Sequence, residues 1–144
     1  MLIKQFSDYA LRVLLFVARS GNRKCTGPEI AEYYDISREH LRKVVHKLAR
    51  HGFLKSMRGR YGGIALARPA DKIRVGDVVA AMEKMTIIDC KALECRLLPG
   101  CSLKSAFARA SRAFIASLNE ATLADLLKDR QMQRQFRGVR IVTK

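Results

Sequence analysis

Three of the four cysteines lie within one stretch of twelve residues, at Cys90, Cys95 and Cys101. Thiolates are soft ligands that bind zinc and the iron of iron-sulfur clusters. The intervening stretches of four and five residues are longer than the two residues of the CxxC pairs in common zinc sites, so the spacing favours an iron-sulfur cluster. A zinc site, or three cysteines without a metal, are the alternatives that the spacing leaves open.

A four-iron cluster needs a ligand for each iron, so a fourth donor has to be found. Cys25 has suitable chemistry, but its position near the start of a short helix also fits a small buried residue. His40, His46 and His51 lie on or just after a basic helix, where contact with DNA or solvent is the simpler expectation. A carboxylate is the remaining possibility.

The elements that must position these residues begin with a winged helix-turn-helix over residues 1–85. Apolar side chains repeat with helical spacing over residues 5–19 and again between Ser37, a good N-cap, and Gly52. Between them, Thr26 and Glu29 form a capping-box pattern that begins a short helix over about 27–34. Strand candidates at 53–57 and 64–67 flank a cationic hairpin that contains glycines. The expected fold class is therefore mainly α with a small β-hairpin wing.

A net charge of +15, from 28 basic and 13 acidic residues, makes a polyanion the leading expected partner. Eight Lys and Arg residues and one acid lie between positions 38 and 60, and the apolar stripe of the helix must face the core. Most of these charges must then face solvent or the phosphates of double-stranded DNA. A merely solvated basic face is the alternative, which the adjoining hairpin disfavours.

The basic region suggests two kinds of DNA contact. Side chains near the start of the helix are placed to reach base edges: Arg38, His40 and Arg42. Other cations are placed to contact phosphates: Lys43, Lys47, Lys55, Arg58 and Arg60. Tyr61 at the hairpin tip suits either the sugar-phosphate backbone or local packing.

The rest of the chain divides into a loop, a long helix and a tail. A helix is predicted over 74–85, and residues 86–101 have no steady period and form the cysteine-bearing loop. Residues 102–128 should hold a long helix with a continuous apolar stripe suited to dimerisation, followed by a short helix. Residues 129–144 are basic, have few apolar anchors, and are expected to be a mobile tail. No run approaches the roughly 20 apolar residues of a membrane span, and the absence of a secretion signal predicts a cytoplasmic protein.

Four segments together resemble the NsrR repressors, nitric-oxide sensors in the winged-helix family that also includes the cluster-sensing IscR regulators. The segments are FSDYALRVL at 6–14, SREHLRKVVHKLARHGFLKSMRGRYGGIALARP at 37–69, IRVGDVVAAME at 73–83 and CKALECRLLPGC at 90–101. The resemblance extends to about residue 128. IscR-type members place a histidine three residues after the last cysteine, where this chain has Lys104, and this departure favours the NsrR branch.

The resemblance implies a homodimer with crossed long helices and an iron-sulfur cluster, [4Fe-4S] or [2Fe-2S], held by Cys90, Cys95 and Cys101. It also implies an unusual fourth ligand, Asp8 of the partner subunit, in the matching FSDYALR motif. Without the resemblance, Asp8 is explained as an acidic residue favoured near a helix N-terminus. The family has no cysteine that matches Cys25, which supports a structural or incidental role for it.

The expected function is that of a transcriptional repressor whose affinity for its operator is controlled by an iron-sulfur cluster that senses nitric oxide. The alternatives are an IscR-like regulator that senses cluster, redox or iron state, and a zinc-stabilised DNA-binding protein. An enzyme is not expected, because the sequence shows no nucleophile-base-acid grouping, phosphate-binding glycine loop or paired catalytic carboxylates.

Overall fold

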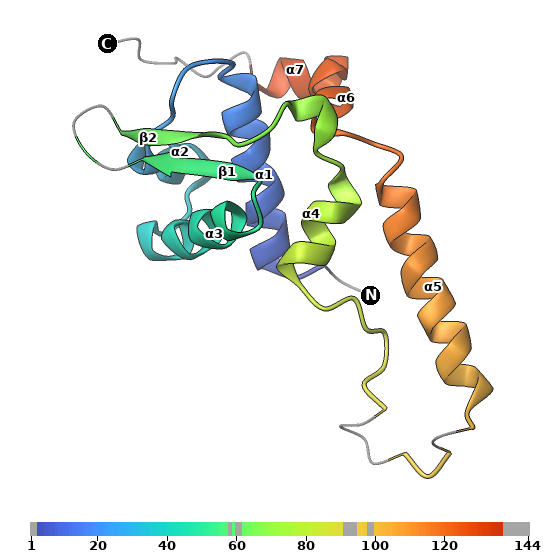
Figure 1. Ribbon diagram of the computed structural model, residues 1–144. Helices are drawn as coiled ribbons and strands as arrows, with labels where there is room; N and C mark the ends of the chain where they lie inside the picture. The colour runs from blue at the N-terminus through green and yellow to red at the C-terminus, as the bar shows by residue number, and fades with distance from the viewer. Residues whose placement is uncertain (1–2, 58, 60–61, 91–94, 98–99, 137–144) are drawn as a thin grey trace.

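The computed structural model describes residues 3–57, 59, 62–90, 95–97 and 100–136. Helices α1 (Gln5–Arg19), α2 (Gly27–Tyr34) and α3 (Arg38–Arg50) precede strands β1 (Leu54–Met57) and β2 (Gly63–Leu66). A short 3-10 helix (Ala70–Lys72) leads to α4 (Val75–Met82), α5 (Ser102–Leu118), α6 (Leu123–Lys128) and α7 (Arg130–Phe136). A mostly helical fold with one antiparallel hairpin confirms the predicted fold class (Figure 1).

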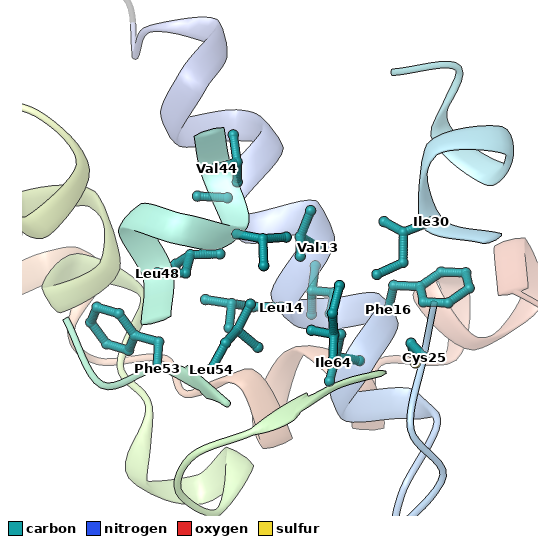
Figure 2. Packing of buried hydrophobic residues seen from close by; sticks show 14 of the residues in the cluster. Val13, Leu14, Phe16, Cys25, Ile30, Val44, Leu48, Phe53, Leu54 and Ile64 are labelled. Carbon is teal, nitrogen blue, oxygen red and sulfur yellow. The ribbon is translucent and has the colours of Figure 1, made fainter. Parts of the chain in front are cut away.

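Helix α1 is the centre of the core. Its apolar stripe, which includes Val13, Leu14 and Val17, is completely or almost completely buried. Figure 2 shows Val13 and Leu14 packed against apolar residues of α3, such as Leu48, and of the hairpin, such as Leu54. Each such burial contributes about 1.5–3 kcal/mol relative to an exposed side chain, so this cluster supplies much of the stability that holds α3 and the wing in place.

Local capping fixes the helix-turn-helix. The Thr26 side chain accepts a hydrogen bond from the backbone N–H of Glu29, and the Glu29 carboxylate accepts one from the Thr26 N–H, which completes the predicted capping box. The turn to α3 passes through Asp35 in the left-handed region at φ 51°, which Asp tolerates better than most residues. Ser37 then caps α3 by accepting from the His40 N–H at 3.2 Å.

The wing is an antiparallel pair in which Leu54 faces Leu66 and Met57 faces Gly63. A third segment joins its edge, because the backbone groups of Cys25 and Ile64 exchange two hydrogen bonds, at 2.9 and 2.7 Å. The chain between α1 and α2 is thereby attached to the wing, so the hairpin has a fixed orientation relative to the helices.

The C-terminal third runs beside this unit and then returns to it. Helix α5 packs along α4, and Leu123 at the start of α6 is fully buried in the core (Figure 1). The structure differs from the expectation of a mobile tail over residues 130–136, which form α7. Phe136 is buried, with its ring stacked 6.1 Å from that of Tyr33. Met132 also packs against the core, and the Asp129 carboxylate accepts hydrogen bonds from the Gln131 and Met132 N–H groups at the start of the helix. Residues 137–144 lie outside the described part of the chain.

Within the described residues, no helix is both long enough and apolar enough to cross a bilayer.

Candidate nucleic-acid interface and cysteine site

Helix α3 separates its apolar and basic residues onto different faces. Its four buried residues are apolar and pack against α1 and the wing: Leu41, Val44, Val45 and Leu48. The three residues predicted to reach bases, Arg38, His40 and Arg42, are all exposed. The helix therefore presents the expected cationic surface to solvent, at the position where a recognition helix enters a major groove.

A groove of about 590 Å³ lies between α3, the start of α2 and the wing. Arg38, Arg42 and His46 line it from one side at intervals of four residues, and Ser56 lies on the wing side. His46 was expected to meet DNA or solvent rather than a cluster, but it was not named among the individual DNA contacts. Its spacing of one helical turn from Arg42 is the signal that could have placed it on this face.

Lys43 is exposed and forms an ion pair with Glu39, with 2.7 Å between Nζ and Oε1. The hydrogen bond from Lys43 holds the pKa of the Glu39 carboxyl below its usual range. Since both side chains are more than half exposed, the pair is weak and leaves Lys43 free to turn toward a phosphate. Lys55 is exposed on β1, whereas Arg58, Arg60 and Tyr61 lie outside the described residues.

Lys47 is placed differently from the other cations. Its ammonium donates a 2.6 Å hydrogen bond to the carbonyl of Met82 at the end of α4, and it lies 5.5 Å from the centroid of the Phe6 ring. A cation is favourable beside the carbonyls at a helix C-terminus. Lys47 thus connects α3 to α4 rather than extending the exposed cationic surface.

The next residue after α4, Glu83, connects the same region to α1. The Glu83 carboxylate accepts a 2.7 Å hydrogen bond from the Ser7 hydroxyl and a 3.2 Å bond from the Lys4 N–H. Ser7 is fully buried, so its hydroxyl depends on this partner. Sequence reasoning missed this contact, because the two side chains are separated by 76 positions and no local pattern relates them.

The three clustered cysteines follow the end of α4, where Met82 and Glu83 make these contacts. Cys90, Cys95 and Cys101 are free thiols of intermediate exposure, and the Cys95 N–H donates to the Cys90 carbonyl at 3.4 Å. Cys90 also lines a cavity of about 300 Å³ whose other walls include Lys104 and Phe107. Their soft donors suit an iron-sulfur cluster or zinc. However, the described residues bring no three His, Cys, Asp or Glu side chains close enough to hold a metal ion.

Asp8 lies in the first turn of α1, away from any such group in the described part of its own chain. Its carboxylate pairs with Arg12 Nε at 2.9 Å, and both side chains are nearly half exposed. An exposed i,i+4 pair contributes only about 0.3–0.5 kcal/mol, so it would be easily exchanged for another partner. Within the described residues, the carboxylate of Asp8 thus has only a weak ion pair.

Cys25 stands apart from the other thiols. It is fully buried in the core, and burial raises the pKa of its thiol. A buried thiol with a raised pKa is a poor nucleophile and metal ligand. The structure supports a packing role for Cys25.

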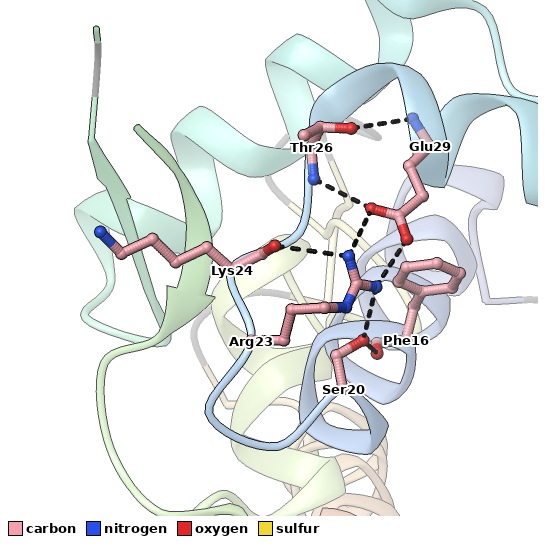
Figure 3. Close-up of polar contacts among 6 residues, drawn as sticks. All are labelled: Phe16, Ser20, Arg23, Lys24, Thr26 and Glu29. Carbon is pink, nitrogen blue, oxygen red and sulfur yellow. Dashed lines mark hydrogen bonds and ion pairs between the residues drawn. The ribbon is translucent and has the colours of Figure 1, made fainter. Parts of the chain in front are cut away.

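The loop that carries Cys25 is held by an ion pair between Arg23 and Glu29 (Figure 3). The guanidinium donates to both carboxylate oxygens, at 2.6 and 3.1 Å, and Arg23 also donates to the Ser20 hydroxyl. The Arg23 hydrogen bonds hold the pKa of Glu29 below its usual range. Because Glu29 also completes the cap of α2, one carboxylate fixes both the loop and the start of the helix-turn-helix.

Comparison with known proteins gives one family match and several similar structures. The model of the Rrf2 family, described as iron-dependent transcriptional regulator, matches residues 3–129. CymR of B. subtilis, the global cysteine regulator, is 25% identical with a TM-score of 0.70, over 88% of this chain and 95% of that one. IscR of T. potens is 27% identical with a TM-score of 0.72, over 90% and 88%. The oxidized form of Staphylococcus aureus CymR is 26% identical with a TM-score of 0.70, over 90% and 98%.

Proposed function

Because this chain belongs to the Rrf2 family of transcriptional regulators, we propose that it is a repressor whose hold on its operator depends on an iron-sulfur cluster that senses nitric oxide. Family membership makes it a DNA-binding regulator of the IscR and CymR type and not an enzyme. The finer proposal depends on one observation. The segment bearing Cys90, Cys95 and Cys101 follows the end of α4, where the carbonyl of Met82 accepts a hydrogen bond from Lys47 of the recognition helix α3.

DNA binding is assigned to α3 and the wing. Arg38, His40 and Arg42 are proposed to read bases, since they are exposed along α3. Lys43 and Lys55 are proposed to contact phosphates, and the hairpin-tip residues are assigned there from the sequence: Arg58, Arg60 and Tyr61. Lys47 was expected to join them, but its bond to Met82 favours a role in positioning α3.

Dimerisation is assigned to α5. No residue of this 17-residue helix is buried, although apolar side chains recur along it, and Leu103 is 54% exposed. Phe107, Phe114 and Leu118 continue the apolar stripe and are only half-buried. The same stripe on a second copy of the chain can bury these apolar side chains, as expected for a homodimer with crossed long helices. A dimer would also present two recognition helices to two half-sites.

The cluster would be held by Cys90, Cys95 and Cys101 of one subunit and by Asp8 of the partner subunit. When bound, the group supplies iron at which nitric oxide can bind. A carboxylate is a harder and weaker ligand for iron than a thiolate, so Asp8 would hold the most labile corner. Its exposed pair with Arg12 is the interaction that it would give up.

The junction after α4 offers a route from the cysteine segment to DNA. Lys47 on α3 bonds to Met82, and Ser7 on α1 bonds to Glu83, so both helices contact the two residues that precede the loop. A change in the loop's anchoring would alter these contacts and the position of α3. A ligand controls DNA binding only if it favours either the DNA-binding or the released conformation over the other. In this proposal, the contacts of Met82 and Glu83 with α3 and α1 differ between these two conformations.

A redox- or iron-sensing regulator of the IscR type is the second candidate, favoured by the similarity to IscR of T. potens. Lys104, where that type has histidine by the resemblance described above, argues for a different ligand set. A zinc-stabilised protein would use the same thiols without the sensing chemistry.

The test is anaerobic purification followed by ultraviolet-visible and Mössbauer spectroscopy. We expect a brown, iron-containing dimer that binds its promoter and releases it on titration with nitric oxide. Cys90→Ala should abolish the visible absorption, Asp8→Ala should weaken it, and Cys25→Ala is the matched control that should keep it. A colourless protein with stoichiometric zinc, or promoter binding unchanged after nitrosylation of the cluster, would refute the proposal.

A further inference from the structure

The C-terminal end of α5 meets the start of α4, which belongs to the DNA-binding unit (Figure 1). Gly76, in the first turn of α4, is buried at this joint. A Cβ placed on Gly76 would lie 2.5 Å from Oδ1 of Asn119 and closer still to the carbonyl oxygen of Ile115. The φ angle of Gly76 is not positive, so glycine is required here by the closeness of the two helices rather than by backbone conformation.

Asn119, at the C-terminus of α5, caps α4 from outside that helix. The N-cap residue of α4, Arg74, provides no side-chain cap of its own. Instead the Asn119 side chain accepts a 2.9 Å hydrogen bond from the Asp77 N–H and donates a 2.9 Å bond to the Asp77 carboxylate. The first N–H groups of a helix have no partner within it, so this cap satisfies one of them.

Arg74, at the start of α4, in turn bonds to the end of α5. Its guanidinium donates a 2.6 Å hydrogen bond to the backbone carbonyl of Asn119, at the negative end of the α5 dipole. The following residues extend the attachment, because Val75 donates to the Ala121 carbonyl and Leu123 donates to that of Ile73. The end of α5 is thus held by side-chain and backbone contacts that leave no room for a methyl group at position 76.

A joint at one end of a long helix sets the position of the other end. At 1.5 Å per residue, the 17 residues of α5 span about 25 Å. A tilt of about 10° at the joint would therefore move the far end by about 4 Å, which is close to the rise of about 3.4 Å between successive base pairs. A small change in the angle between α4 and α5 is therefore enough to alter the spacing between the two recognition helices of a dimer.

We propose that Gly76 and Asn119 determine the spacing between operator half-sites that the dimer accepts. The close approach at Gly76 fixes the separation of α4 and α5, and the Asn119 cap fixes their register. This inference rests on the proposed function in one respect, namely that two copies associate through α5 and bind two half-sites. Both are positioning residues, since the contacts described above join the start of α4 to the end of α5.

The experiment first uses the wild-type full-length protein, prepared anaerobically, to select a palindromic duplex from a random pool. The spacer between half-sites is then varied one base pair at a time, and affinities are measured for wild type, Gly76→Ala and Asn119→Ala. The expected result for Gly76→Ala is a preferred spacer changed by at least one base pair, with at least a tenfold loss of affinity at the wild-type optimum. Asn119→Ala adds no atoms and should bring affinities for adjacent spacers within threefold of one another.

Circular dichroism and sedimentation establish that each variant is a folded dimer. Ala80→Ser adds one atom at an exposed position of α4, the same helix as Gly76, and should keep the wild-type spacer preference. Folded dimers of both variants with the wild-type spacer preference would overturn the inference. If Gly76→Ala does not fold, the result for Asn119→Ala decides alone. A wild-type protein that stays monomeric, or that selects no palindrome, would instead refute the proposed function, so the two failures are distinguishable.

Discussion

Arg23 and Glu29 form the best-placed ion pair in the described residues, with about a quarter of each side chain exposed. We predict that Glu29→Gln lowers the free energy of unfolding by about 1–2 kcal/mol at pH 7, because a bidentate charged hydrogen bond and part of a helix cap are weakened. Glu32→Gln, an exposed change in the same helix, is the matched control. Urea denaturation measures both.

The same pair gives a pH dependence with a definite sign. The pKa of Glu29 is lowered in the folded protein, chiefly by its hydrogen bonds from Arg23. Its contribution is therefore complete above the unfolded value of about 4.3 and is lost as pH falls through the lower folded pKa. The difference in stability between wild type and Glu29→Gln should shrink below about pH 4.3. A difference that stays constant down to pH 2 would contradict this origin.

Ser7 and Glu83 should be coupled in a double-mutant cycle. Glu83→Ala leaves a buried hydroxyl without its partner and should cost about 1–3 kcal/mol of unfolding free energy. In the background of Ser7→Ala, the same change should cost less, because no hydroxyl is left unsatisfied. Chemical denaturation of the four proteins gives the coupling energy, and additive effects would show that the contact does not stabilise the fold.

At the scale of elements, α7 contacts both α2 and α1 through one side chain. Phe136 stacks with Tyr33 and lies under Arg19, whose guanidinium is 4.8 Å from the ring centroid. We predict that Phe136→Ala lowers the free energy of unfolding by about 3 kcal/mol and speeds hydrogen exchange in α2. Gln135→Ala, an exposed change next to it, should do neither. Unchanged exchange in α2 would mean that α7 does not support the helix-turn-helix.

Local signals explain which elements the sequence predicts correctly. The Thr26 and Thr122 capping boxes and the Ser37 cap lie within four residues of their partners, and the apolar stripe of α1 follows one helical period. Each of these can be found from spacing alone. Helix α7 could not, because Phe136 stacks on a tyrosine of α2 far earlier in the chain, and its two apolar residues, Met132 and Phe136, are too few to establish a helical period.

The candidate site likewise contains features that local sequence signals predict and contacts between distant segments that they do not. Arg38, His40 and Arg42 were predicted from their charge and their place near the start of the helix, and all three are exposed, as a contact with DNA would require. The contact of Lys47 with Met82 and that of Asn119 with Asp77 were missed, since each joins segments more than thirty residues apart. For Lys47 the prediction of a phosphate contact used its charge but had no information about α4, which offers a nearby helix C-terminus.

For the whole molecule, a net charge of +15 raises the question whether DNA binding is a property of the basic surface at large or of one face. Lys55 on β1 and Lys128 at the end of α6 are both exposed, and Figure 1 shows β1 to the left of α1 and α6 to its right. Removing either one changes the charge of a dimer by the same amount. The two substitutions therefore separate a general electrostatic attraction from contact at the proposed interface.

We predict that Lys55→Ala weakens binding to operator and to random DNA by similar factors. It should reduce the slope of log K against log salt concentration by about 1.8, because each phosphate contact contributes about 0.9 and a dimer loses two. Lys128→Ala should leave that slope within about 0.3 of wild type, since its ammonium would touch no phosphate. Fluorescence anisotropy from 50 to 300 mM salt measures both. Equal changes in the two variants would mean that charge is read over the whole surface, and the assignment of the interface to α3 and the wing would then be wrong.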